Sequence, residues 1–300
     1  VLVHHARLSA VFGAVMGLAP VHRWARFYFR VARELGARVE DDSLRAFILA
    51  HEGYYEAGIG SWHACARHLE ESIELYDRVG DVRLAEESVS ILAYAMFYKG
   101  ERARSLELYK RLERSGDERG DTQIVGWGVT NRIKLMIAAG QQGAIDDALL
   151  ARAEGLLVDG ITKAVHDGVL VELALARGDL EGARRAAEAG MERLEKSPPR
   201  SFMACSTYAS IADALLACGA KSPRDRALRA RAEKAVRALA SIARVFPIAE
   251  PARLRAAGLL ASLGGRRARA RALLDRASKL AAEHEQPADE ARSRAALAAL

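Results

Sequence analysis

The chain has 300 residues, of which 50% are hydrophobic and 28% charged, and its formal net charge is +6. This composition, with few prolines and little aromatic content, is typical of a soluble, helix-rich protein that can bury a large core. The three cysteines, Cys65, Cys205 and Cys218, are odd in number and widely spaced, which argues against a disulfide framework and indicates a reducing compartment.

The positive charge is concentrated toward the C-terminus. From Lys221 onward the chain has 18 Lys and Arg against 8 Asp and Glu, whereas the first 220 residues have 27 against 31. The densest cluster is Arg266, Arg267, Arg269 and Arg271. A basic stripe can attract nucleic acid through phosphate contacts, but no aromatic residue alternates with these arginines to stack on bases. We therefore interpret the stripe as a solvated face of Ala-rich helices.

The first apolar segment runs from Leu8 to Val21. It resembles a signal-peptide core but is too short to span a bilayer, which takes about 20 apolar residues, and no small-x-small cleavage site follows it cleanly. Two interpretations remain, a signal peptide and the first helix of the protein, and we favour the helix. Val1 is not a methionine, so the chain is either a fragment or has its initiator written as Val.

Glycine recurs along the chain at near-constant intervals. One series, with steps of 38 to 45 residues, is Gly60, Gly100, Gly140, Gly178, Gly219 and Gly264, and a second series is Gly80, Gly120 and Gly160. Gly17 fits a degenerate first repeat. Periods of about 20 to 50 residues are typical of arrays in which each helical pair packs on its neighbours. The spacing predicts one all-α helical solenoid over residues 1–300, with about six to seven helix-turn-helix repeats.

The segment after Gly60 has the spacing of an amphipathic helix. Its apolar residues recur at steps of three and four, at Trp62, Cys65, Leu69, Ile73 and Tyr76. Gly80 is expected to end this helix in the left-handed conformation, and Asp81 to cap the next helix by accepting free N–H groups. Gly120 and Asp121 repeat the same pattern, and the helix after Asp81 is expected to run to Gly100.

Prolines interrupt the later part of the chain. Ser197-Pro198-Pro199 must break a helix, because proline lacks the amide N–H and clashes with the preceding turn. We expect the array to bend or change register there, with a sub-boundary near residues 197–200. Pro287 precedes a last Ala-rich helix, which would cover the exposed end of the array.

Four segments match parts of the tetratricopeptide pattern. They are Tyr208-x2-Ile211-Ala212-x2-Leu215, Val89-x2-Leu92-Ala93-x2-Met96, Cys65-x3-Leu69 and Ser105-x3-Tyr109. The chain thus resembles a tetratricopeptide-like repeat region, which implies a right-handed superhelical solenoid. Residues 40–190, with Gly80-Asp81 and Arg119-Gly120-Asp121-Thr122-Gln123, resemble the C-terminal part of bacterial ATPase-linked adenylate or guanylate cyclases and of related serine/threonine kinase fusions. The catalytic domains of that family are absent from this chain.

Motifs for catalysis or metal binding are missing. The chain has no G-x-x-x-x-G-K-S/T phosphate cradle. His51-Glu52 begins like a zinc-protease helix, but the histidine expected four residues after His51 is replaced by Tyr55. His63, Cys65 and His68 have spacings that do not place three ligands on one side of a helix. We therefore predict no catalytic residue, no cofactor and no metal site.

A concave groove is the best candidate for a binding site. Aligning the repeats on their glycines places six residues on or near this face: Phe47, Tyr54, Tyr94, Phe97, Trp127 and Lys134. The aromatic residues could grip a protein or peptide segment, or belong to the core between helices. Asn131 is the only asparagine, so the two-asparagine carboxylate clamp of chaperone-binding tetratricopeptide domains is not expected.

The sequence leads to a functional expectation with two alternatives. We expect a non-catalytic, cytoplasmic interaction and regulatory module, the tail of a multidomain signalling ATPase of cyclase or kinase type, with a protein partner and neither nucleic acid nor membrane. One alternative is the small-ligand sensor domain of an ATP-dependent transcriptional regulator. The other is a fragment of an adenylate or guanylate cyclase, which would be called a cyclase only because of catalytic domains that this chain does not contain. Oligomeric state and partner identity do not follow from the sequence.

Overall fold

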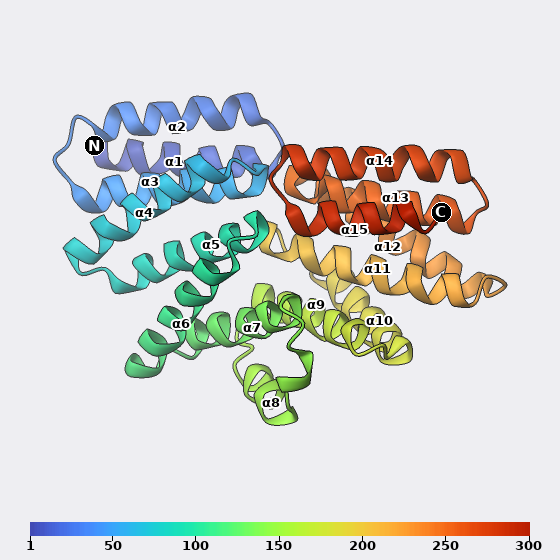
Figure 1. The fold of residues 1–300 in the computed structure, drawn as a ribbon. Coiled ribbons are helices and arrows are strands. Elements are labelled where there is room, and N and C mark those ends of the chain that lie inside the picture. Colours follow the sequence, from blue (N-terminus) through green and yellow to red (C-terminus); the bar gives the residue numbers. More distant parts are fainter. The chain divides into compact units, whose positions relative to one another are not determined.

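The computed structural model describes residues 1–300 and contains helices and turns without any strand, which confirms the predicted all-α class (Figure 1). The helices are fifteen α-helices and three short 3-10 helices. The chain divides into two compact units. Unit one comprises residues 1–112 and 245–247, and unit two comprises residues 113–244 and 248–300.

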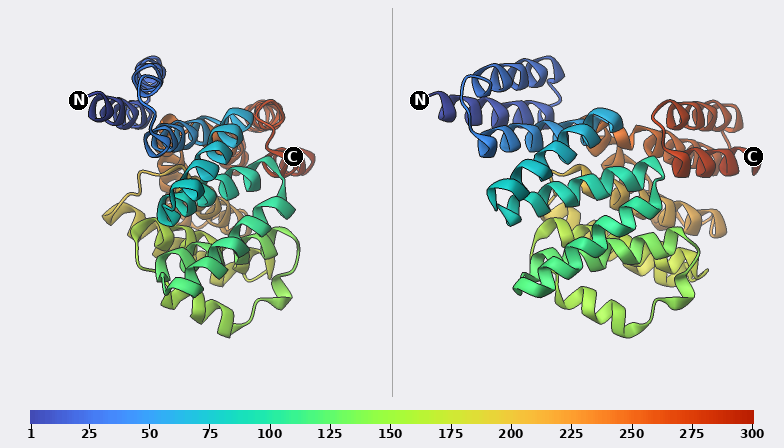
Figure 2. Two further views of the ribbon diagram at one scale, coloured as in Figure 1. Left: turned by 90° about the vertical axis from the view of Figure 1, so that its left-hand side faces the viewer. Right: turned by 60° about the vertical axis from the view of Figure 1, so that its left-hand side comes forward.

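Unit one is built from helices α1 to α5 and most of α6. Their bounds are α1 Leu2–Leu18, α2 His22–Gly36, α3 Asp42–Ile59, α4 Trp62–Val79, α5 Val82–Lys99 and α6 Arg102–Arg119. Each of α1 to α4 packs against the next helix, and α1 also packs against α3, as the blue ribbons in Figure 2 show. The apolar segment that starts at Leu8 is therefore helical up to Leu18, in agreement with the helix interpretation.

Glycine and aspartate set the helix ends of unit one. Gly60, Gly80 and Gly100 each end a helix in the left-handed region, with φ between 77° and 86°. Asp81 accepts a hydrogen bond from the Leu84 amide at 3.2 Å and so caps α5. These ends confirm the predicted glycine stops and the predicted cap.

Small residues on one face of α1 let its neighbours approach closely. The buried residues of α1 are Ala6, Ala10, Gly13 and Gly17. A Cβ atom on Gly13 would lie 2.8 Å from the Phe29 ring, and one on Gly17 would lie 2.6 Å from the Tyr55 ring. Gly17 is therefore a packing residue in the last turn of α1, which ends at Leu18, and the degenerate first repeat that it fits stays a prediction.

Unit two contains the end of α6 and helices α7 to α15. Their bounds are α7 Thr122–Ala138, α8 Asp147–Gly155, α9 Gly160–Ala176, α10 Leu180–Lys196, α11 Cys205–Lys221, α12 Arg226–Val245, α13 Glu250–Leu263, α14 Arg267–Glu283 and α15 Pro287–Ala298. The 3-10 helices, η1 Gln142–Ala144, η2 Phe202–Ala204 and η3 Pro247–Ala249, precede α8, α11 and α13. Helix α11 packs against α9, α10 and α13, and α13 packs against α14 and α15.

Asp121 caps α7 as predicted, because its carboxylate accepts hydrogen bonds from the Gln123 and Ile124 amides. The predicted break at Ser197 is also confirmed, since α10 ends at Lys196. Pro287 is the first residue of α15, where a missing N–H costs nothing. The bend expected near residues 197–200 stays a prediction.

Two glycines of the two series do not end a helix, and a third ends one without the left-handed conformation. Gly160 is the first residue of α9, and Gly219 lies inside α11. Gly264 has a φ of −86°, and the left-handed position after α13 belongs to Gly265, with a φ of 72°. Glycine serves other purposes than stopping helices, so regular spacing alone over-predicts helix ends in unit two.

Helix α11 is a buried helix of unit two. Residues Phe202–Lys221 form the one helical stretch that is long and apolar enough to cross a membrane by length and composition, and 78% of the apolar window is buried. Tyr208, Ile211 and Leu215 on this helix are buried. Burial of this extent is typical of the core helix of a globular domain.

A buried arginine links three helices of this core. Arg255 on α13 is 2% exposed and donates to Asp213 on α11 at 2.7 Å and to Asp289 on α15 at 2.5 Å. Burial alone would lower the pKa of the Arg255 guanidinium, but the two carboxylates raise that pKa above its ordinary value. Arg255 therefore stays charged and holds α11, α13 and α15 together.

Candidate functional site

Four residues of the predicted groove lie in unit one, at different depths. Tyr94 is 1% exposed, and its ring packs against the rings of Phe97 and Tyr98 at centroid distances of 6.4 and 5.5 Å. Phe47, Tyr54 and Phe97 are partly buried. Tyr94 therefore belongs to the core, and truncating it would act mainly on stability. The other three rings retain an exposed part that a partner can reach.

The two remaining groove residues, Trp127 and Lys134, lie on α7 in unit two. The Trp127 indole donates to the Asp159 carboxylate at 3.3 Å. Lys134 is 3% exposed, and its ammonium group donates to the Ser206 hydroxyl at 2.5 Å. Lys134 is thus a buried structural residue, and Trp127 is partly buried and hydrogen-bonded. A partner-binding role for these residues remains a prediction.

A cluster of exposed rings covers the outer side of α1 and α2. We call this cluster the α1–α2 aromatic patch and define it as Phe12, Trp24, Phe27 and Tyr28. Phe12 of α1 stacks on Tyr28 of α2 at 5.6 Å, and Tyr28 also lies 5.4 Å from Phe27 and 6.3 Å from Trp24. Trp24 is 53% exposed and Phe12 47%. The four rings therefore form one continuous surface.

The exposure of this patch follows from the composition of the two helices. Because α1 buries only alanine and glycine, its large side chains fall on the opposite face, where Leu8 and Val15 flank Phe12 at helical spacing and are exposed. Helix α2 buries Ala25, Phe29 and Ala32. Its other rings therefore stay outside the core.

The charged residues that precede Glu34 in the sequence are all basic, and Glu34 of α2 lies 4.0 Å from the Arg30 guanidinium. The first 33 residues include five arginines, and the first acidic residue of the chain is Glu34. The Arg30 guanidinium lies over the Phe27 ring, 5.5 Å from its centroid, in a cation–π contact. The N-terminal helices therefore combine exposed aromatic rings with a basic surface.

A cavity of about 740 Å³ lies beside α2, α3 and α4. Its volume falls in the range of small-molecule sites, which is about 300 to 1,000 Å³. Its lining is rich in charged side chains, however, and some of them are paired: Arg45 binds Glu71, and Asp42 binds Arg78, which lies outside the lining. Ligand pockets are mostly apolar, so this lining does not favour a ligand-sensor function.

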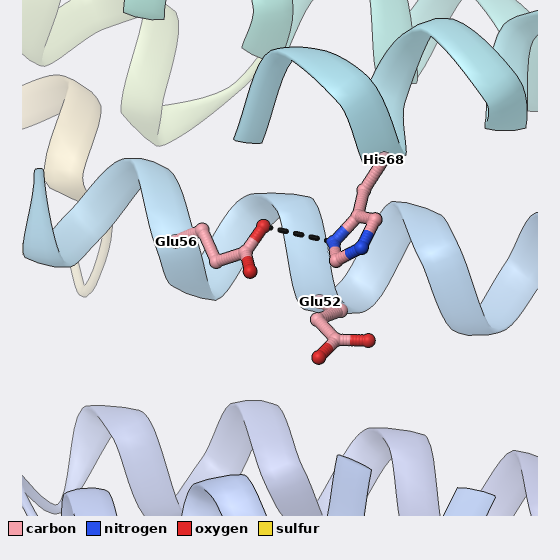
Figure 3. Close-up of side chains that lie close together, drawn as sticks. All are labelled: Glu52, Glu56 and His68. Atoms are coloured by element: carbon pink, nitrogen blue, oxygen red, sulfur yellow. Dashed lines mark hydrogen bonds and ion pairs between the residues drawn. The ribbon is translucent and has the colours of Figure 1, made fainter. Parts of the chain in front are cut away.

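Next to this cavity, three potential metal ligands come together (Figure 3). Glu52 and Glu56 project from α3 and His68 projects from α4, with their ligand atoms within 4.8 Å of one another. His68 Nδ1 lies 2.9 Å from Glu56 Oε2, and one oxygen of Glu52 is hydrogen-bonded by Arg33 of α2. We call these three residues the Glu-Glu-His cluster.

The sequence contained part of the signal for this cluster. Glu52 and Glu56 are four residues apart, so a helix places both on one face. The zinc-protease pattern that begins at His51 does not include Glu56, because its second metal ligand is a histidine. His68 joins it only because α4 packs back on α3, which no local pattern specifies. The grouping of His63, Cys65 and His68 does not form: His63 is exposed and Cys65 is buried.

The three cysteines are expected to be unreactive. Cys65, Cys205 and Cys218 are buried free thiols. Burial raises the pKa of each thiol, so the reactive thiolate is scarce at neutral pH.

No family model matches the chain, and no curated protein matches it. The resemblance to tetratricopeptide regions of cyclases and kinases therefore remains a prediction.

Proposed function

We propose that this chain is a non-catalytic protein-interaction module that docks an acidic amphipathic helix of a partner protein on the α1–α2 aromatic patch. The observation that supports the proposal most directly is the exposure of Phe12, Trp24 and Phe27 in an arginine-rich segment, residues 1–33, that has no acidic side chain. Continuous apolar patches of this kind mark interaction sites in soluble proteins.

The shape of the patch favours a helix as the bound element. Leu8, Phe12 and Val15 form a stripe along α1, a helix of 17 residues and hence about 25 Å long. An amphipathic helix presents a stripe of the same spacing and can lie along it. Trp24 and Phe27 would serve as the aromatic anchors that dominate such interfaces.

The charge favours an acidic partner. Arg23, Arg26 and Arg30 lie on the same helix as the anchors, and no carboxylate precedes Glu34. A helix with glutamate or aspartate on its polar face would be attracted, whereas a basic helix would be repelled.

In the same proposal, the helix pairs form a right-handed superhelical solenoid of tetratricopeptide type. The chain acts in the cytoplasm as the regulatory tail of a multidomain signalling ATPase of cyclase or kinase type. The all-helical fold, the glycine-ended and aspartate-capped helices and the repeat spacing support this part of the proposal.

Two synthetic helical peptides test the docking. Both carry the same leucine and phenylalanine stripe, one with glutamate and the other with lysine on the polar face. Fluorescence anisotropy with the full chain should show at least about tenfold tighter binding of the glutamate peptide at low salt, and a smaller difference at high salt. Trp24→Ala should weaken this binding by about 1–2 kcal/mol.

Val158→Ala is the matched control, because Val158 is an apolar side chain that is 54% exposed in unit two. It should leave peptide binding unchanged. Equal affinity for the two peptides, or binding that is indifferent to Trp24→Ala, would contradict the proposal. Two further results would contradict it. If Trp24→Ala disrupted a dimer of the chain, or binding to anionic phosphatidylserine vesicles, and not peptide binding, the patch would serve a second copy or a membrane.

A further inference from the structure

We propose that the Glu-Glu-His cluster of Glu52, Glu56 and His68 binds one divalent transition-metal ion, with Zn²⁺ as the best-fitting species. The site is separate from the α1–α2 aromatic patch and does not depend on the proposed docking function. A metal bound there would link α3 to α4, which already pack against each other.

The geometry is close to that of a formed site. Ligand atoms bound to Zn²⁺ at about 2.0–2.2 Å in tetrahedral geometry are about 3.3–3.6 Å apart. His68 Nδ1 and Glu56 Oε2 are 2.9 Å apart, and all three ligand atoms fit within 4.8 Å. Small side-chain movements therefore convert the cluster into three corners of a tetrahedron, which leaves the fourth corner for water.

A buried oxygen supplies a second, independent indication of a ligand. Glu52 is 8% exposed, and its Oε2 is buried without any hydrogen-bond partner. Leaving such an atom unpaired is costly, so unpaired buried oxygens are rare in native proteins. A cation in the cluster would give Glu52 Oε2 the partner it lacks.

Arg33 positions this carboxylate. It hydrogen-bonds Glu52 Oε1 from α2, and Oε2 of the same carboxylate has no hydrogen-bond partner. Metal-bound carboxylates commonly have such an outer partner, which fixes their orientation. The Arg33 charge also opposes a cation, and the two carboxylates of the cluster offset it.

The ligand set selects the class of metal. Two carboxylates and one neutral imidazole offer a mixed oxygen and nitrogen environment. Imidazole suits zinc and other transition metals, whereas Mg²⁺ and Ca²⁺ prefer oxygen ligands alone. Metal at His68 Nδ1 places the ring proton on Nε2, so the exposed Arg67 guanidinium, 3.4 Å from Nε2, has to turn away.

Titration of the full, metal-free chain with ZnCl₂ tests the proposal by isothermal calorimetry and thermal unfolding. We expect one Zn²⁺ per chain and a higher Tm with zinc, because a ligand that binds only the folded state stabilises it. Glu56→Gln and His68→Ala should each weaken binding by at least about tenfold.

His63→Ala and Glu71→Gln are the matched controls, because both residues lie on α4 outside the cluster. They should bind zinc like the original chain. Absence of stoichiometric binding would overturn the proposal, and so would unchanged binding in folded Glu56→Gln.

X-ray absorption at the zinc edge identifies the zinc ligands in the original chain, so this measurement does not depend on whether the variants fold. The original chain should show a single imidazole among the zinc ligands. Two or more imidazoles would assign the zinc to other histidines, such as His4 and His5, and would overturn the proposal.

Discussion

Helices α1 and α11 are alike in length and apolar character, but they differ in whether their large side chains are buried. Each has 17 residues. Helix α11 buries its large side chains, including Ile211 and Leu215, whereas α1 exposes Leu8 and Phe12 and buries alanine and glycine. The difference lies in their neighbours, because α11 packs mainly against α9, α10 and α13, whereas α1 packs mainly against α2 and α3.

This comparison shows that apolar content does not decide whether a helix is core. What decides is whether other elements cover the face that carries the large side chains. A covered face contributes to folding stability, and an uncovered one is available for binding. The predictions below separate these two roles.

The largest loss of stability is expected from replacing the buried arginine of α13, which links α11 to α15. Arg255→Ala leaves Asp213 and Asp289 without their shared counter-charge, and it should lower the free energy of unfolding by about 3–5 kcal/mol in urea denaturation. Arg294→Ala is the control, because Arg294 is exposed and pairs with Glu290 one helical turn away. A loss near that of the control would show that α11 does not depend on this link.

A second prediction applies one substitution to both helices. Leu215→Ala on α11 creates a cavity and should cost about 2–5 kcal/mol. Leu8→Ala on α1, where the side chain is 55% exposed, should change stability by no more than about 0.5 kcal/mol. Chemical denaturation of both variants measures the difference. Similar losses would mean that α1 is covered in solution, for example by a second copy.

The smallest effect concerns a histidine on α9, which covers α11. Burial lowers the pKa of His166, and Arg193 lowers it further, while Asp167 and Glu154 oppose the shift. The folded protein therefore keeps His166 neutral below about pH 6.5, where the unfolded chain takes up a proton. Stability should fall as the pH is lowered through this range, and less so in His166→Gln. Identical pH profiles for the two proteins would show that water reaches His166.

The sequence predicted the local features of the fold better than its long-range contacts. The end of α4 at Gly80 and the caps at Asp81 and Asp121 depend on a few adjacent residues, and all were confirmed. Gly219 was misjudged because a glycine can pack inside a helix as well as end one, and the spacing of glycines does not distinguish the two uses.

The candidate sites depended on contacts that a sequence does not display. The groove residues were chosen by repeat register, which could not show that Tyr94 and Lys134 are buried. The Glu-Glu-His cluster needs α4 to return along α3. The α1–α2 aromatic patch was missed because the repeat register gave groove candidates only from Phe47 onward and so left out Phe12 and Trp24.

The glycines that end helices in unit one have one further consequence. A Cβ atom on Gly80 would meet no other atom within 4 Å, and the residue has a φ of 77°. An L-amino acid there would be strained only by its own handedness, since nothing crowds it. D-alanine prefers this mirror-image backbone region, so a semisynthetic chain with D-alanine at this position should be more resistant to heat, because its denatured ensemble has fewer conformations to explore.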